Sequence, residues 1–199
     1  MRIFAPIALI LAATALFAGT APSHGAAPTH GTSRAIDPAR STMTVYAYKT
    51  GLFAFAADNH QISAPIATGS IDEAAHSVTL SVDARGMRVL DPKSPNNRDK
   101  VQSNMLGPQV LDAAKYPTIS FRSTGWRVDS PMHFTITGNL TLHGQTHEVL
   151  VNVDRKGDGS YAGNATVKQT DFGITPITIA GGTVRVKDDV RIEFTIAAS

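Results

Sequence analysis

The chain has 199 residues, no cysteine, and a formal net charge of +2 that includes the arginine at position 2. This length allows one domain with a sizeable core, and the lack of cysteine excludes disulfides, thiolate nucleophiles and thiolate metal sites. Basic and acidic residues are scattered in near balance, so neither a nucleic-acid-binding nor a membrane-surface function is expected.

The chain begins with the pattern of an export signal. A short basic region precedes an apolar run, Ile3 to Phe17, which is too short to span a bilayer comfortably. We therefore expect residues 1–25 to be a cleaved signal peptide and the mature protein to be periplasmic or secreted, without stable membrane insertion. An uncleaved membrane anchor is the alternative. Residues 26–36 lack apolar periodicity and are expected to form a disordered leader to a single domain over residues 37–199.

The rest of the chain predicts an all-β domain. In Thr42–Tyr48 apolar residues alternate with Thr and Tyr, as in a strand between two environments. The same alternation recurs in Ser77–Val82, Thr118–Arg122, His133–Thr137, Asn139–Leu142, Glu148–Val153, Tyr161–Lys168 and Thr183–Ile196. Glycine turns at His143–Gln145 and Lys156–Gly159 favour hairpins. Short strands with such punctuation are typical of a sandwich or a barrel.

One interval breaks the strand pattern. Between residues 97 and 114, Val101, Met105 and Leu106 have helical spacing, and Gly107-Pro108 interrupts them. We predict a helical segment there.

The stretch from Lys115 to Val149 carries a family signature. Tyr116-Pro117, the alternating Ile119 and Phe121, Gly138–Thr141 and Gly144–Thr146 follow the order YP-x-I-x-F-x-S … G-x-L-T-x-x-G-x-T. This order resembles that of the YceI-like proteins, which are extracytoplasmic antiparallel β-barrels that carry polyisoprenoid or other long-chain lipids. The resemblance implies an eight-stranded, lipocalin-like barrel with the helical segment across one opening.

The resemblance also implies a carrier and not an enzyme. Its ligand would be a long-chain apolar molecule, such as an isoprenoid, a quinone or a fatty-acyl compound, held inside the barrel by desolvation and without a cofactor. The residues expected to contact the ligand are Val45, Phe53, Phe55, Ile62, Met105, Leu106, Phe121, Phe134, Phe172 and Ile174. Alternation alone does not separate a tunnel lining from a filled core.

Three polar residues are candidates for contact with a ligand head group. Asn59 and His60 lie in a segment that departs from the common family wording, and turn capping is their alternative role. Gln169 stands where the family usually has an arginine. Because glutamine lacks the charge and the paired donors of arginine, we expect a neutral head group in preference to an anionic one.

Two rival functions remain open at this stage. A barrel filled with side chains would act as a protein-interaction or stress-related module, and a lipid-modifying enzyme would need a titratable pair inside the cavity. No nucleophile elbow or phosphate loop is present, and His143 and His147 flank a turn instead of sharing a helical face, so no metal site is expected. The resemblance allows for a homodimer.

Overall fold

The computed structural model describes residues 33–51, 59–91 and 97–199. These residues form twelve strands, one α-helix and three short 3-10 turns. The strands are β1 (Arg34–Ala35), β2 (Thr42–Thr50), β3 (His60–Ser63), β4 (Ile66–Asp72), β5 (Ser77–Asp83), β6 (Arg88–Val89), β7 (Thr118–Ser130), β8 (His133–Leu142), β9 (Gln145–Arg155), β10 (Tyr161–Lys168), β11 (Thr178–Ile179) and β12 (Val184–Ile196). The helix α1 spans Arg98–Leu106, and the turns span Ala84–Gly86, Thr170–Phe172 and Ala180–Gly182.

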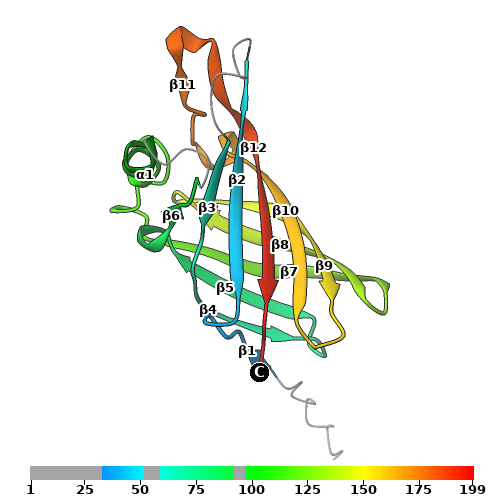
Figure 1. Cartoon of the computed structure of the whole chain (residues 1–199). Helices are drawn as coiled ribbons and strands as arrows, with labels where there is room; N and C mark the ends of the chain where they lie inside the picture. Colours follow the sequence, from blue (N-terminus) through cyan, green and yellow to red (C-terminus); the bar gives the residue numbers. More distant parts are fainter. Residues whose placement is uncertain (1–32, 52–58, 92–96) are drawn as a thin grey trace, which may run out of the picture.

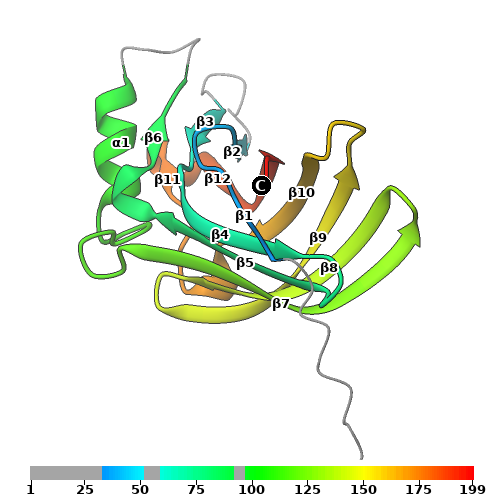
Figure 2. The same cartoon turned by 90° about the horizontal axis from the view of Figure 1, so that it is seen from below.

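All strands belong to one antiparallel sheet that curls around a central space (Figures 1 and 2). The strand order is β1-β4-β5-β7-β8-β9-β10-β12-β2-β3-β6, and β11 pairs with β12 outside this path. Strands near the two ends of the path are consecutive in the chain, because β3 is followed by β4 after Ala64-Pro65 and β5 by β6 after Ala84–Met87. The sheet is curled into a half-barrel.

The end of the sheet opposite α1 is held by the two termini of the domain. Ile36 forms a bridge with Ala198, and the Asp37 amide donates to the Ala197 carbonyl at 2.9 Å. Figure 1 shows β1 beside the C-terminus at this end, while α1 and β11 lie at the other. We refer to these as the terminal end and the helix end.

The predicted all-β antiparallel class with one helix is confirmed, but the strand number of eight is wrong. The ranges 133–137 and 139–142 form one strand, β8, with Gly138 in its middle. That glycine makes room for an aromatic ring, because a Cβ there would lie 2.3 Å from Cζ of Phe121. The strands β1, β3, β4, β6 and β11 were not predicted, and each is either very short or poor in alternating apolar residues.

The predicted hairpin turns are confirmed, and so is the predicted helical segment with its interruption at Gly107-Pro108. His143 and Gly144 adopt φ values of 51° and 75° between β8 and β9, as a two-residue hairpin turn requires. Helix α1 ends at Leu106, and residues 107–114 form turns, because the Pro108 ring cannot continue a helix. In the described part of the chain no helix is long and apolar enough to cross a membrane.

Side-chain contacts attach α1 to the sheet edge. Gln102 accepts a hydrogen bond from the Val89 amide at 2.7 Å and donates to the Met87 carbonyl at 2.9 Å. The Gln102 amide therefore pairs with β6 as a neighbouring strand would. Met105 is buried beneath the helix in the same core cluster as Val89. The helix end of the sheet is covered on one side by this arrangement.

Candidate functional site

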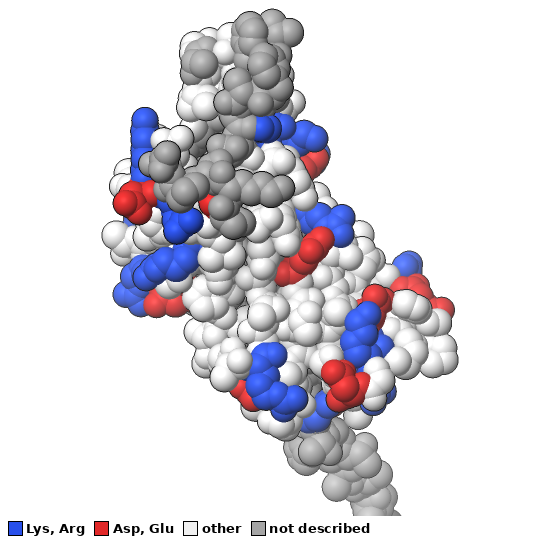
Figure 3. Space-filling view, in the orientation of Figure 1, with Lys and Arg blue, Asp and Glu red and all other residues white. Residues whose placement is uncertain are grey.

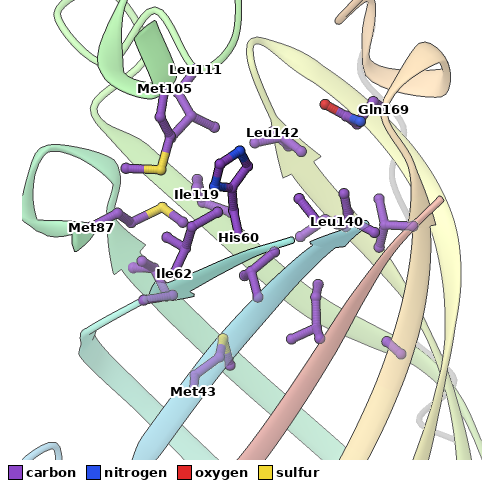
Figure 4. Close-up of a pocket in the computed structure, with 18 of the residues that line it drawn as sticks. Met43, His60, Ile62, Met87, Met105, Leu111, Ile119, Leu140, Leu142 and Gln169 are labelled. Carbon is purple, nitrogen blue, oxygen red and sulfur yellow. The ribbon is translucent and has the colours of Figure 1, made fainter. Parts of the chain in front are cut away.

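A cavity of about 540 Å³ lies inside the curled sheet. Its volume falls within the roughly 300–1,000 Å³ range of small-molecule sites. Alternate residues of the surrounding strands point into it, and its wall is mainly aliphatic. Wall residues include Val45, Ile62, Leu80, Val82, Met105, Ile119, Phe121, Leu140, Val151, Ile174 and Ile192, and Figure 4 shows part of this lining. Such a wall has few polar groups that an apolar ligand would leave without hydrogen-bond partners.

The structure places five of the ten residues predicted to contact a ligand on this wall. They are Val45, Ile62, Met105, Phe121 and Ile174. They come from β2, β3, α1, β7 and the segment after the Thr170–Phe172 turn. Residues that are up to 129 positions apart in sequence are thereby brought around one space.

Three of the predicted residues lie elsewhere, and two fall outside the described residues. Phe134 is buried against Trp126, with ring centroids 5.3 Å apart, and Phe172 is fully buried beneath β9 and β10. Leu106 packs against the core cluster under α1. None of these three is on the cavity wall. Phe53 and Phe55 lie outside the described residues.

Several wall residues were missed by sequence reasoning. Met43 shares the inward face of Val45, so strand alternation could have identified it. Met87 directly follows the Ala84–Gly86 turn and Leu111 lies in a turn, where no periodic signal exists. Both methionines and Leu111 are visible beside the cavity in Figure 4. Methionine fits irregular apolar space well because its chain is flexible and polarizable.

A buried carboxylate holds His60 at the helix end of the cavity. Nδ1 of His60 lies 2.6 Å from Oδ2 of Asp91, and Oδ1 of Asp91 accepts the Gln61 amide at 2.9 Å. When Nδ1 carries the hydrogen, the Asp91 carboxyl group accepts both bonds and Nε2 is left for another partner. Figure 4 shows the imidazole projecting into the cavity near Ile119 and Leu142.

The backbone of Asp91 is unusual. Its φ is +26°, and the residue is only 4% exposed. Residues other than glycine adopt positive φ at an energetic cost, and such positions cluster at functional sites. Asp91 is also the one acidic residue on the described wall. The pair His60–Asp91 is therefore a polar feature built into an otherwise apolar surface.

The other predicted head-group residues have different surroundings. Gln169 is on the cavity wall at the end of β10, and its side-chain amide donates to the Lys187 carbonyl at 2.8 Å. Asn59 is not on the wall. Its Oδ1 accepts the Lys49 amide at 3.2 Å, so the side chain ties the start of β3 to the end of β2. This contact matches the capping alternative for Asn59.

A lysine at the end of β2 was missed by sequence reasoning. Met43, Val45, Ala47 and Lys49 are spaced by two and all lie on the cavity wall. Alternation would have pointed to Lys49, since it continues the inward face. Helix α1 adds Lys100 at the helix end of the wall, flanked by asparagines at positions 97 and 104. The polar part of the wall is thus concentrated where α1 and the ends of β2 and β10 meet.

The terminal end of the cavity is closed by a second polar cluster. The Tyr161 hydroxyl bonds to Glu73 and Arg34, and Glu73 also pairs with Arg34 at 2.9 Å and Arg155 at 3.2 Å. Burial, and then the hydrogen bond to Glu73, raises the pKa of Tyr161 above its usual value. The residue Tyr161 lines the cavity, and its hydroxyl is bonded to this cluster. The cluster connects β1, β9, β10 and the β4–β5 turn at the terminal end.

The remaining histidines near the family motif pack against Phe172. Nδ1 of His143 lies 3.1 Å from the Phe172 carbonyl oxygen, and the His147 ring meets the Phe172 ring edge-on at 5.2 Å. Among residues 33–51, 59–91 and 97–199 no group of three potential metal ligands is close enough to hold an ion. On the outer face in Figure 3, basic and acidic side chains are interspersed.

Comparisons with known proteins agree with this architecture. The UPF0312 protein of Vibrio cholerae is 28% identical over 129 residues, which are 60% of this chain and 63% of that protein. A UPF0312 protein of Pseudomonas syringae is 34% identical over 86 residues, covering 39% of this chain and 43% of its own. The chain therefore spans less than two thirds of the relatives it matches.

A solved structure shares the fold. The crystal structure of Burkholderia cenocepacia BcnA superimposes with a TM-score of 0.61 at 20% identity, covering 82% of this chain and 99% of BcnA. The YceI-like domain family matches residues 35–198, which include every strand of the curled sheet except the first residue of β1. By this match, the chain belongs to the YceI-like family.

Proposed function

We propose that this protein is an extracytoplasmic carrier that holds one long-chain apolar molecule in its cavity. The observation that carries this proposal is the space of about 540 Å³ with a mainly aliphatic wall. A filled protein-interaction module would have used that volume for side chains, since protein interiors are normally close-packed. The isoprenoid, quinone and fatty-acyl classes all present the long apolar chain that such a wall suits.

The binding energy would come mainly from desolvation. Each methylene moved from water into the cavity contributes about 0.8 kcal/mol, which is roughly a fourfold gain in affinity. His60 and Gln169, at the helix end, are the proposed contacts for the head group. The apolar chain would extend toward Tyr161 at the terminal end, because the polar wall residues of the helix end favour placing the head group there.

The apolar run at residues 3–17 supports export, and we propose a periplasmic or secreted location. A carrier in an aqueous compartment shields its cargo from water between two membranes or proteins. That role requires binding and release only, so no cofactor enters the proposal.

The first test is native mass spectrometry of mature protein purified without detergent, followed by organic extraction. A discrete extra mass that extracts as a prenyl, quinone or acyl compound is expected. Protein that arrives empty would next be titrated with n-alcohols of 10 to 16 carbons. Affinity should then rise roughly fourfold per methylene until the cavity is full. Absence of any bound lipid, together with affinity that does not depend on chain length, would contradict the carrier function.

A further inference from the structure

We infer that the ligand is a long-chain carboxylate whose head group lies between Lys49 and His60. This inference rests on the proposed carrier function and specifies its ligand class. It reverses the expectation that the sequence at Gln169 suggests, namely a neutral head group.

The register of β2 and β3 brings the two residues to the same part of the wall. Ala47 of β2 is paired with His60 of β3, and Lys49 lies two positions further along β2. Residues two apart on a strand share a face, so Lys49 and His60 are diagonal neighbours on the inward face. Diagonal neighbours across a strand pair are about 7–8 Å apart, which leaves room for a carboxylate between two long side chains.

Lys49 has no acidic partner in the described part of the chain. The ion pairs there involve other basic residues, and the hydrogen bond at Lys49 uses its backbone amide. On its other side Lys49 is paired with Val186 of β12, which also lines the cavity. Lys49 is half-buried as a residue, and a charged group that is held partly away from water is more favourable when an anion accompanies it.

His60 supplies the second contact. The hydrogen bond between Nδ1 of His60 and the Asp91 carboxyl group holds the ring in one orientation. Nε2 is therefore available for a contact with the ligand. When Nε2 also carries a hydrogen, it donates to the ligand carboxylate while Nδ1 donates to Asp91. Asp91 does not compete for the ligand, since both its oxygens already accept hydrogen bonds from His60 and Gln61.

The basic groups at this end favour a single negative charge in the interior part of the cavity. Among the basic wall residues Lys49 is half-buried, whereas Lys100 and Arg185 are exposed. Gln169 adds no charge. A carboxylate matches both the charge and the two donors, Nζ of Lys49 and Nε2 of His60.

The test compares three ligands with the same sixteen-carbon chain: hexadecanoate, hexadecanol and hexadecanamide. Equilibrium dialysis at pH 7.5 would measure their dissociation constants for wild-type protein, Lys49→Met and Lys156→Met. Methionine keeps most of the apolar stem of lysine and removes the charge. Lys156 is the control because it lies in the β9–β10 turn, where it pairs with Asp154. Lys49→Gln is the second variant should Lys49→Met fold poorly.

Wild-type and Lys156→Met proteins should bind hexadecanoate roughly 10- to 100-fold more tightly than the two neutral ligands, the range expected for a charge-assisted hydrogen bond. Lys49→Met should lose that preference and keep its affinity for hexadecanol. Equal binding of all three ligands by wild-type protein, or an unchanged preference in Lys49→Met, would overturn the carboxylate assignment and leave the carrier function standing. If none of the three ligands binds, the carrier function itself fails, and the carboxylate assignment with it.

Discussion

Replacing Ala165 by phenylalanine should fill part of the cavity and leave the sheet folded. Ala165 lies in the middle of β10, on the cavity wall, with Val151 of β9 and Ile192 of β12 as its cross-strand partners. A benzyl group built from this position extends into the space that the ligand chain would occupy.

The expected loss of affinity follows from the methylenes displaced. If the ring excludes three or four methylenes of a sixteen-carbon ligand, the loss is about 3 kcal/mol at 0.8 kcal/mol each. This corresponds to a dissociation constant roughly 100-fold higher. Because the added ring is buried in existing space, we expect folding stability to fall by no more than the roughly 1–3 kcal/mol that overpacking costs.

The assay pairs hexadecanol binding with thermal unfolding. Thr166→Phe is the matched control, because Thr166 is the next residue of β10 and is exposed on the outer face. Its affinity for hexadecanol should equal that of the wild type. If Ala165→Phe folds and binds hexadecanol with unchanged affinity, the ligand does not occupy the centre of the cavity and the reasoning is refuted.

Three further outcomes follow from contacts around the cavity. Gln102→Leu leaves the buried Val89 amide without its partner, so urea unfolding should show a loss of about 1–3 kcal/mol, and hydrogen exchange at that amide should accelerate. Because burial raises the pKa of Tyr161, the unfolded state ionises first, and stability should fall as the pH rises above about 10; Tyr161→Phe should remove part of that alkaline dependence. The Thr170 hydroxyl lowers the pKa of Asp188, so this carboxylate stabilises the fold above about pH 4 and the effect is lost as the pH falls through its folded pKa. Asp188→Asn should therefore reduce the decrease in melting temperature that occurs as the pH falls below about 4. If that decrease is unchanged in the variant, other groups cause it.

The strands with clear alternation could be predicted from sequence, and the strands formed by pairing alone could not. Tyr161–Lys168 was predicted with the bounds that β10 has. By contrast, β4 reads IATGSID, with two polar residues and a glycine between its two isoleucines and an aspartate at its end. It exists because β5 pairs with it along its length and β1 along its other edge. Such non-local hydrogen bonding leaves little trace in the residues of one strand.

The candidate site divides in the same way. Val45 follows from strand alternation, and Lys49 would have followed had the alternation been continued by one step. The pairing of His60 with Asp91 joins residues 31 positions apart, and no local pattern connects them. Phe134 shows the opposite failure: it has the correct periodicity, but its ring packs against Trp126 and is not on the cavity wall, although Ile136 and Val153 of the same core cluster are.

The apolar cavity and the polar residues at its helix end have a common explanation in ligand binding. An empty apolar space lowers stability, because its lining atoms lose the dispersion contacts that a packed core would supply. A left-handed conformation at Asp91 adds a further cost. Selection for folding alone would have filled the cavity with side chains and removed the positive φ at Asp91. A ligand restores the missing contacts only while it is bound, and a head group at Lys49 and His60 compensates two polar side chains at the same time. The features that cost the empty protein stability are therefore those that bind the cargo, and a bound protein should be more stable than an empty one in proportion to ligand affinity.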